Sequence, residues 1–445
     1  MLRPLEGGIL TEPRLLFDHF DTSQIAANPY DGLVAKRFGP YDKNYRRFSE
    51  IRYCSVASSP TKPSLDLILQ NLRKGGSRGF SGGISAYFRT EITEVGSVVS
   101  EDDSTESMIA SAEKLLAKSN QNFDLAYVYV PASARYILNS PYYRVKALFA
   151  QHGIPSQMVT TNTDPNNTYH LFNIAVGSYA KMGGVPWALL DGLKNIDCLL
   201  GVSFSEHVSE LERITEKPRY VGFVNIFDNR GIWLAMMGTA EQYDWEEFPF
   251  RIKLLLRDSI KFYENKKGRK PKSILIHTSK KIGGREVKCV NDGLSTAYGG
   301  NYESQVRYGM IHISDDIPVR FYDISDPNRT PPRGLVTKTD DSTVFLCTTG
   351  RSEIRGARMG TPVNLRVYMK AKSPDSELNI YDIAKHVLAL TKLNYGALSA
   401  VQRNPVSIAY SNELAYMTAA LEHEEWEKLI KNPIAEKLKQ VLWFL

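Results

Sequence analysis

Residues 125–161 read LAYVYVPASARYILNSPYYRVKALFAQHGIPSQMVTT, and this stretch decides the class of fold. The run 125–130 has the length and composition of a buried strand. Residues 141–151 are predicted to form a helix, because Ser140 is a favourable N-cap residue and a proline fills the first helical position. Residues 157–161 read as the next strand. A helix between two such strands predicts neighbouring parallel strands in an α/β protein.

The same alternation extends over residues 46–170, which predicts a doubly wound, Rossmann-like lobe with helices on both faces of a parallel sheet. The polar stretch Ser97–Ser107 is expected to be a solvated loop. The further elements expected in this lobe are strand Ile51–Val56, helix Ser64–Arg73, strand Ile84–Arg89 and helix Met108–Lys118.

A different order of elements follows from about residue 196. Three strands come in quick succession, and turn residues 228–231 between the second and third predict a hairpin. A helix at about 250–265 and a strand at Ser273–Thr278 complete the order of a ribonuclease-H-like fold. The three strands are Cys198–Phe204, Tyr220–Phe227 and Ile232–Met237, and the later elements are strands near 308–313, 343–348 and 364–369 and helices at about 380–393 and 410–430.

The composition bounds the class of protein. The chain has 445 residues, of which 42% are hydrophobic and 23% are charged, so two or three globular domains are expected and wholesale disorder is excluded. No apolar run is long enough to cross a bilayer, and the first residues lack the pattern of a signal peptide, so we expect a soluble intracellular protein. The four cysteines are too far apart for a zinc knuckle and read as buried thiols.

The charge is mildly basic, with a formal net charge of +6 and a pI of about 8.8. This balance permits a polyanionic partner without requiring one. The densest basic run is Lys266–Lys272, which links the predicted helix at 250–265 to the strand at Ser273–Thr278. Two interpretations stay open for it, a solvated linker or a contact to phosphate.

The start of the helix at Pro141 is a candidate anion site. Unpaired amide groups at a helix N-terminus carry partial positive charge. Tyr142 and Lys146 are four residues apart and therefore share one face near that end. A phenol beside an ammonium group suits a phosphate that carries a stackable base. The alternative is an ordinary amphipathic helix with an exposed lysine.

Three further features extend this candidate. Gln157 stands at the edge of the next strand. A helical pattern beginning at Asn173 ends at a pair of glycines, with Lys181 in its last turn. The chain finishes Trp443-Phe444-Leu445, and such an apolar end predicts a buried terminus whose carboxylate needs a cation or hydrogen-bond donors.

Taken in order, these motifs resemble the MID–PIWI half of prokaryotic Argonaute proteins, especially the short Piwi-like members. The motifs are Tyr142-x-x-x-Lys146, Pro155-Ser156-Gln157, Lys181-x-Gly183-Gly184-x-Pro186-Trp187 and the final Trp-Phe-Leu, with the segments Glu12–Phe17 and Phe38–Asp42 similar to the family's lead-in. The resemblance implies an α/β protein in which a Rossmann-like MID lobe packs on a ribonuclease-H-like PIWI lobe. The implied division is a lead-in at 1–45, a MID domain at 46–170 and a PIWI domain at 171–445.

The resemblance also implies a site. In the family, the matching tyrosine, lysines and glutamine bind the 5′-phosphate of a guide strand, and the tyrosine stacks on its first base. A divalent cation, usually Mg²⁺, joins that phosphate to the C-terminal carboxylate. Carried over, the guide-binding residues are Tyr142, Lys146, Gln157 and Lys181, and the metal-binding group is the carboxylate of Leu445.

Target-cleaving relatives hold two metal ions with carboxylates, and this chain departs from that pattern. Ser203 stands where the first aspartate belongs, Ser279 occupies the second acid position, and Asn412 falls near the fourth. Asp197 cannot substitute, since it precedes Ser203 by six residues, about 20 Å along a strand. Neutral hydroxyls are poor ligands for hard divalent ions, so we expect no slicing activity.

A basic, glycine-containing segment is expected to follow a sugar–phosphate backbone without reading bases. The alternative for this segment is a solvated loop and strand edge. Its candidate residues are Arg351, Arg355, Arg358 and Arg366.

The resemblance therefore implies a catalytically inactive, cytoplasmic Argonaute that binds a guide RNA and pairs it with a complementary DNA target. Its output is expected from a partner carrying an APAZ region and a sirtuin-like or TIR NADase or a nuclease, in defence against plasmids or phages. Three alternatives stay open. They are a target-cleaving Argonaute, a stand-alone nucleic-acid-binding protein, and a nucleotide-utilising Rossmann enzyme, for which Gly79–Gly83 is the nearest glycine-rich turn but precedes a predicted strand.

Overall fold

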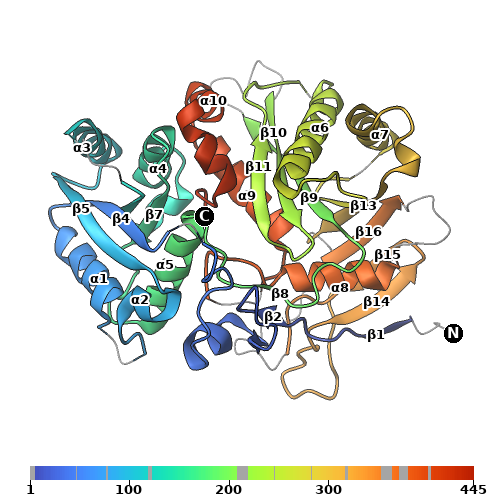
Figure 1. Ribbon diagram of the computed structural model, residues 1–445, viewed down its shortest axis with the longest axis horizontal. Coiled ribbons are helices and arrows are strands. Elements are labelled where there is room, and N and C mark those ends of the chain that lie inside the picture. The colour runs from blue at the N-terminus through green and yellow to red at the C-terminus, as the bar shows by residue number, and fades with distance from the viewer. Residues whose placement is uncertain are drawn as a thin grey trace.

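The computed structural model contains two large sheets, each covered by helices, with the chain end lying between the two lobes (Figure 1). The class is α/β, as predicted. The structure describes residues 6–46, 48–76, 79–118, 123–207, 219–244, 246–281, 283–315, 319–351, 363–369, 379–398 and 402–445.

The first lobe is built on a four-stranded parallel sheet in the order β5-β4-β6-β7, which confirms the predicted Rossmann-like pattern. Alternate side chains of β4 and β6 enter two different cores, so α1, α2 and α5 cover one face and α3 and α4 the other. The strands are β4 (Glu50–Ser58), β5 (Glu91–Ser100), β6 (Leu125–Val130) and β7 (Ser156–Thr160). The helices are α1 (Lys62–Lys74), α2 (Gly83–Phe88), α3 (Thr105–Lys118), α4 (Pro141–Gln151) and α5 (Thr168–Lys181).

One strand of this lobe was predicted in the wrong place. The segment Ile84–Arg89 is helical and belongs to α2, which begins after Gly82 and Gly83, both with positive φ. The strand is β5 instead, and it includes Ser97–Ser100 of the stretch predicted to be a loop. Because β5 is the edge strand of the sheet, most of its side chains are exposed and polar, and this conceals the pattern of a strand.

The second lobe is built on a nine-stranded mixed sheet in the order β1-β14-β15-β16-β13-β12-β9-β10-β11. The hairpin of β10 and β11 is as predicted. Strand β9 pairs with β10 in antiparallel and with β12 in parallel, which is the ribonuclease-H-like arrangement. The strands are β1 (Gly7–Ile9), β9 (Cys198–His207), β10 (Arg219–Asp228), β11 (Trp233–Gly238), β12 (Ser273–Thr278), β13 (Arg307–Ser314), β14 (Leu335–Asp340), β15 (Thr343–Leu346) and β16 (Val363–Met369).

Helices cover both faces of this sheet (Figure 1). On one face lie α6 (Phe248–Lys267) and α7 (Gly284–Tyr298), and α7 was not predicted. On the other face lie α8 (Ile380–Leu390), α9 (Val406–Ala419) and α10 (His423–Lys431). The single helix expected at about 410–430 is therefore two helices.

The N-terminal segment fastens the two lobes together. A small sheet joins β2 (Leu15–Leu16) to β3 (Ile25–Ala26) and β8 (Ala188–Leu189). The Asp42 carboxylate accepts hydrogen bonds from the Tyr179 hydroxyl at 2.5 Å and from the Val185 amide at 3.0 Å. Toward the second lobe, Glu12 pairs with the buried Arg333 at 3.0 Å and the buried Lys392 at 2.7 Å. One hydrophobic core runs through both lobes, so their relative position is held by packing.

None of the helices in the described part of the chain is long and apolar enough to cross a membrane.

Candidate nucleic-acid interface

The N-terminus of α4 has no side-chain cap. Ser140 takes the N-cap position with extended backbone, and Pro141 is the first helical residue, as predicted. The Ser140 hydroxyl does not cap the helix, however, because it donates to the carbonyl of Ala134. The partial positive charge of this helix end is therefore not offset by a capping oxygen.

Two lysines with fully buried ammonium groups flank this helix end. Lys146, on α4, is 1% exposed, and its Nζ donates to the carbonyl of Phe444 and to a backbone oxygen of Leu445, each at 2.7 Å. The same Nζ lies 5.5 Å from the centre of the Tyr142 ring. Lys181, in the last turn of α5, is also 1% exposed and donates to Gln157 Oε1 at 2.9 Å.

The electrostatics of both lysines are unfavourable in the structure as it stands. Burial lowers the pKa of Lys146 to about 7. Burial, followed by the positive charges of Lys146 and Arg135, holds the pKa of Lys181 well below its usual value. Among the described residues, neither ammonium group pairs with a side-chain carboxylate. Lys181 bonds to the neutral amide oxygen of Gln157, whereas Lys146 bonds to the Phe444 carbonyl and to the terminal carboxylate of Leu445. One terminal carboxylate therefore stands against two ammonium groups. An anion bound here would supply the missing negative charge.

These residues converge on one open groove of about 870 Å³, formed by both lobes. Four of the five predicted site residues line it directly, and Lys146 lies behind Tyr142 and Leu445. The second lobe contributes Asn412 and Tyr416 of α9 and the loop around Arg403. The four lining residues are Tyr142, Gln157, Lys181 and Leu445.

The chain end reaches this groove because the tail before it is buried. Trp443 and Phe444 are almost fully inaccessible to solvent. The ring centre of Phe444 lies 5.7 Å from that of Tyr410 and 6.0 Å from that of Trp233. Aromatic packing against the second lobe thus positions Leu445 beside Lys146 of the first.

Three residues of the candidate site were not predicted from the sequence. A Cβ on Gly177 would lie 2.8 Å from Gln157 Oε1 and 3.8 Å from Lys181 Nζ, so this glycine leaves room for the glutamine–lysine contact. Arg135 and Glu413 form an ion pair of 3.3 Å across the groove, from η2 (Ala132–Tyr136) to α9. A lone glycine in a helix could have been noted, but nothing in the sequence pairs residues 135 and 413.

Of the three positions that would hold catalytic acids, Ser203 and Ser279 do not line the groove, whereas Asn412 does. Ser203 is buried on the face of β9 that packs against α9. Ser279 is exposed just after β12, and its carbonyl accepts a hydrogen bond from His312 Nε2 at 3.1 Å. Asn412 lines the groove. No group of three or more His, Cys, Asp or Glu side chains that could hold a metal ion occurs in the described ranges.

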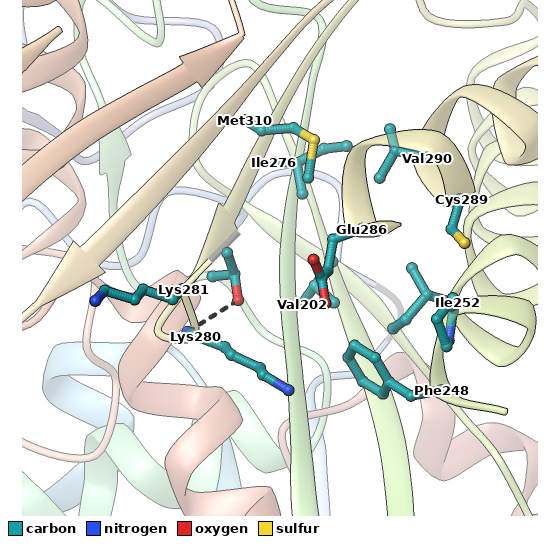
Figure 2. A pocket seen from close by; sticks show the side chains of 12 residues that line it. Val202, Phe248, Ile252, Ile276, Lys280, Lys281, Glu286, Cys289, Val290 and Met310 are labelled. Carbon is teal, nitrogen blue, oxygen red and sulfur yellow. Dashed lines mark hydrogen bonds between the residues drawn. The ribbon is translucent and has the colours of Figure 1, made fainter. Parts of the chain in front are cut away.

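A second cavity opens between β9, β12 and the helices α6 and α7 (Figure 2). Its lining is apolar, including Val202, Ile276 and Phe248, and its volume of about 30 Å³ leaves space for only about one or two waters. Lys280 stands at its edge, with Nζ 5.0 Å from the centre of the Phe248 ring, and burial lowers its pKa to about 8. This cavity is too small for a nucleotide.

The basic segment predicted to follow a nucleic-acid backbone is largely outside the described residues. Arg355 and Arg358 lie there, and for Arg366 only the backbone within β16 is described. Arg351 is described, and its guanidinium pairs with Asp323 and Asp326 at 2.8 Å each. The role of this segment stays a prediction.

Comparison with known proteins gives consistent relatives. No family model matches. The chain is 22% identical to an Argonaute protein of Cereibacter sphaeroides over 96% of its own length and 58% of that protein. It is 24% identical to a Piwi protein of Archaeoglobus fulgidus over 63% of its own length and 66% of that protein. The chain therefore spans less than two thirds of these relatives' lengths.

Solved structures with the same fold are also Argonautes. Clostridium butyricum Argonaute, bound to a guide DNA and a 19-mer target DNA, superposes with a TM-score of 0.68 at 18% identity, over 94% of this chain and 53% of that one. A. aeolicus Argonaute gives 0.64 at 18% identity, over 93% and 53%. The 445-residue chain is thus similar in sequence to Argonaute and Piwi proteins, and its α/β fold is that of the matching part of Argonaute structures.

Proposed function

We propose that the groove binds the 5′-phosphorylated end of a guide strand, which then pairs with a complementary target. The observation that carries this proposal is the convergence of two buried ammonium groups, those of Lys146 and Lys181, on one groove, with only the terminal carboxylate of Leu445 as a negative partner in contact with either of them among the described residues. Buried charges are costly unless they are paired, and a terminal phosphate of charge near −2 would pair both.

Each residue then has a physical role. Lys146 and Lys181 neutralise the phosphate, the uncapped end of α4 adds its partial charge, and Gln157 donates its amide nitrogen. The face of Tyr142, which lines the groove, stacks on the first base. Phosphate contacts of this kind bind any sequence, so sequence selection belongs to base pairing between guide and target.

The residues of the groove supply only part of the oxygen ligands that a divalent cation needs. Gln157 Oε1 and the Leu445 carboxylate are hard oxygen donors of the kind that Mg²⁺ prefers, but both already accept hydrogen bonds from lysines. Two such donors cannot complete a coordination shell. We therefore propose that Mg²⁺ is held by the Leu445 carboxylate together with phosphate oxygens of the guide, and that it neutralises the remaining negative charge between them.

We also propose that the target is not cleaved. Ser203 and Ser279 at the two acid positions support this, because neither hydroxyl supplies the charge that two-metal chemistry requires. The remaining proposals rest on family resemblance. They are an RNA guide, a DNA target, an APAZ-containing effector partner with NADase or nuclease activity, a role in defence, and a cytoplasmic location. The Clostridium butyricum neighbour holds a guide DNA, so a DNA guide is the direct alternative.

The first experiment is sequencing of the nucleic acid that co-purifies with the protein. We expect small 5′-phosphorylated RNAs. The second is binding of 5′-phosphate and 5′-hydroxyl oligonucleotides to the wild type and to Lys146→Ala/Lys181→Ala. Loss of two charge-assisted contacts should weaken 5′-phosphate binding at least about 100-fold and leave 5′-hydroxyl binding nearly unchanged.

A matched control replaces two exposed lysines away from the groove, Lys114→Ala/Lys261→Ala, and should bind like the wild type. Unchanged 5′-phosphate affinity in Lys146→Ala/Lys181→Ala would refute the guide-end assignment. Metal-dependent cutting of a guide-complementary strand would instead favour a target-cleaving Argonaute. A chain that binds guide and target but neither captures nor activates the product of a neighbouring gene would favour a stand-alone binding protein.

A further inference from the structure

Most of the basic run Lys266–Lys272 is fastened to the protein rather than free in solvent. Lys267 pairs with the buried Asp228 at 2.8 Å. Lys270 donates to the carbonyl of Ala297 at 2.7 Å. Arg269 makes a two-pronged contact with Asp197, at 2.9 and 3.1 Å. The run therefore forms a rigid frame.

Asp197 is the centre of this frame. Besides Arg269, its carboxylate accepts the backbone amide of Lys272 at 2.7 Å. Its own amide donates to the side chain of Ser273 at 2.8 Å, and its carbonyl accepts the Tyr263 hydroxyl at 3.1 Å. With so many bonds made, the Asp197 carboxylate has little capacity left to neutralise other cations nearby.

A separate open pocket of about 450 Å³ lies against this frame. It is formed at the amino ends of the parallel strands β9, β12 and β13, and it shares no lining residue with the groove. Four cationic side chains line it, from three segments of the chain, against the two carboxylates of Asp191 and Asp197. The four are Lys194, Arg269, Lys272 and Arg307.

Three of these cations have no partner among the residues that the structure describes. Within the described part of the chain, the side chains of Lys194, Lys272 and Arg307 make no hydrogen bond or ion pair, and Arg307 is half-buried at the first position of β13. Four cations against two carboxylates leave an excess of two positive charges around one concave surface. A phosphoryl group that carries two negative charges matches this excess, whereas a carboxylate would cancel only half of it.

We propose that this pocket binds a phosphoryl anion, with Lys194, Lys272 and Arg307 as its ligands and the Asp197–Arg269 pair holding the frame. This anion site is independent of the proposed guide end, because the two sites have different residues and lie on different edges of the fold. The phosphoryl group can come from a free nucleotide or from the backbone of a nucleic acid, and the test separates these sources.

The test uses the 445-residue chain freed of nucleic acid, with Lys146→Ala/Lys181→Ala in the background so that the groove no longer binds a terminal phosphate. Oligonucleotide binding is assigned to the pocket only where Lys272→Ala/Arg307→Ala weakens it. Isothermal titration follows three probes, namely inorganic pyrophosphate, ATP and a 5′-hydroxyl oligonucleotide. We expect at least one probe to bind, and Lys272→Ala/Arg307→Ala to weaken that binding by at least about tenfold per cation removed. Binding of pyrophosphate and ATP alone indicates a nucleotide; binding of the oligonucleotide alone indicates a backbone contact.

Two controls keep the result decisive. Lys114→Ala/Lys261→Ala should leave the affinity unchanged, and Lys194→Ala, a change on an exposed loop, should weaken it even if the double variant folds poorly. Arg307→Lys keeps the charge and should retain most of the binding. The proposal is overturned if no probe binds, or if the affinity is the same with and without Lys194, Lys272 and Arg307. Neither result would bear on binding at the groove.

Discussion

The groove and the pocket at the amino ends of β9, β12 and β13 (the amino-edge pocket) both contain cationic side chains. They differ in whether the most enclosed cations are paired with a side-chain carboxylate. In the groove, Lys146 and Lys181 are buried and share a single negative partner, the terminal carboxylate of Leu445 beside Lys146, and their pKa values are lowered. At the pocket, Arg269 is paired with the Asp197 carboxylate, whose pKa is also lowered. The groove therefore holds positive charge at a cost in stability until an anion arrives, whereas the frame of the pocket is already neutralised within the protein.

The largest effect is expected when the two buried ammonium groups of the groove are removed. In Lys146→Met/Lys181→Met the buried ammonium groups are replaced by apolar side chains of similar length. We expect the guide-free protein to melt at a higher temperature, because the cost of burying two ammonium groups is removed and the remaining Leu445 carboxylate lines the open groove. Affinity for a 5′-phosphorylated oligonucleotide should fall at least about 100-fold.

Calorimetry of the free protein and titration with the oligonucleotide measure the two effects separately. A lower melting temperature together with unchanged affinity for the 5′-phosphorylated oligonucleotide would mean that the two lysines stabilise the fold and do not bind the phosphate.

The pH dependence of guide binding is the next largest effect. Because burial lowers the pKa of Lys146 to about 7, this lysine loses its proton in the free protein as pH rises through about 7, and it is mostly neutral between pH 8 and 9. A bound phosphate favours the charged form, so binding takes up a proton and affinity falls as pH rises, by up to about tenfold per pH unit. The phosphate itself is fully dianionic over this range and does not mask the trend.

The stability of the guide-free protein should move in the opposite direction. The folded-state pKa of Lys146 lies below its unfolded value, so the unfolded chain binds more protons between pH 7 and about 10. Its contribution to the free energy of unfolding therefore increases as pH rises through that window, and Lys146→Met removes this slope. Titration in buffers of different ionisation enthalpy counts the protons taken up; zero uptake at pH 8 contradicts the assignment.

Gly177→Ala tests the geometry of the groove without touching a charge. The added methyl would lie 2.8 Å from Gln157 Oε1, so the amide must move away from Lys181. We expect a loss of 5′-phosphate affinity of about tenfold, the equivalent of one disturbed hydrogen bond. Gly300→Ala is the matched control, because a Cβ there meets nothing within 4 Å. Equal affinity in both variants would show that the Gln157–Lys181 contact does not matter for binding.

Features that depend on residues close together in the sequence could be predicted, whereas contacts between distant residues could not. The i, i+4 pair Tyr142 and Lys146 and the Ser-Pro start of α4 depend on neighbouring residues, so they were predictable. The ion pair of Arg135 with Glu413 joins residues 278 positions apart, and neither side chain has a distinguishing context. The pairing of the three-residue β1 with β14 is hidden for the same reason.

Competing local signals explain the other errors. Glycines 82 and 83 read as a turn before a strand at Ile84, but their positive φ values start a short helix instead. The Ser140 hydroxyl was expected to cap α4, and it bonds to the nearby Ala134 carbonyl because that acceptor is within reach. The basic run at 266–272 has the composition of a solvated linker, and only the fold reveals the carboxylates and carbonyls that fasten it.

The ion pair across the groove should have a smaller influence on binding. Glu413 is the one side-chain carboxylate among the described residues that line the groove, and it opposes the approach of a phosphate. Glu413→Gln should therefore strengthen 5′-phosphate binding about threefold to tenfold, and Arg135→Ala should weaken it by a similar factor. Because both side chains are well exposed, the melting temperature should barely change. Weaker binding by Glu413→Gln would show that the carboxylate helps to hold a cation instead.

The smallest effect is expected at the frame of the amino-edge pocket, and it lies on the acidic side of the pH scale. Partial burial raises the pKa of Asp197, but hydrogen bonds from Arg269 and the Lys272 amide outweigh it and hold the pKa below its usual value. Its stabilising contribution is thus present above about pH 4 and lost as pH falls through the folded-state pKa.

Asp197→Asn should lower the free energy of unfolding by at most about 1 kcal/mol at pH 7, since Arg269 is half-exposed. Guide affinity should not change, whereas phosphoryl binding at the pocket should weaken as the frame loosens. If guide affinity fell as well, the groove and the amino-edge pocket would be coupled through the sheet. The two sites would then not bind anions independently.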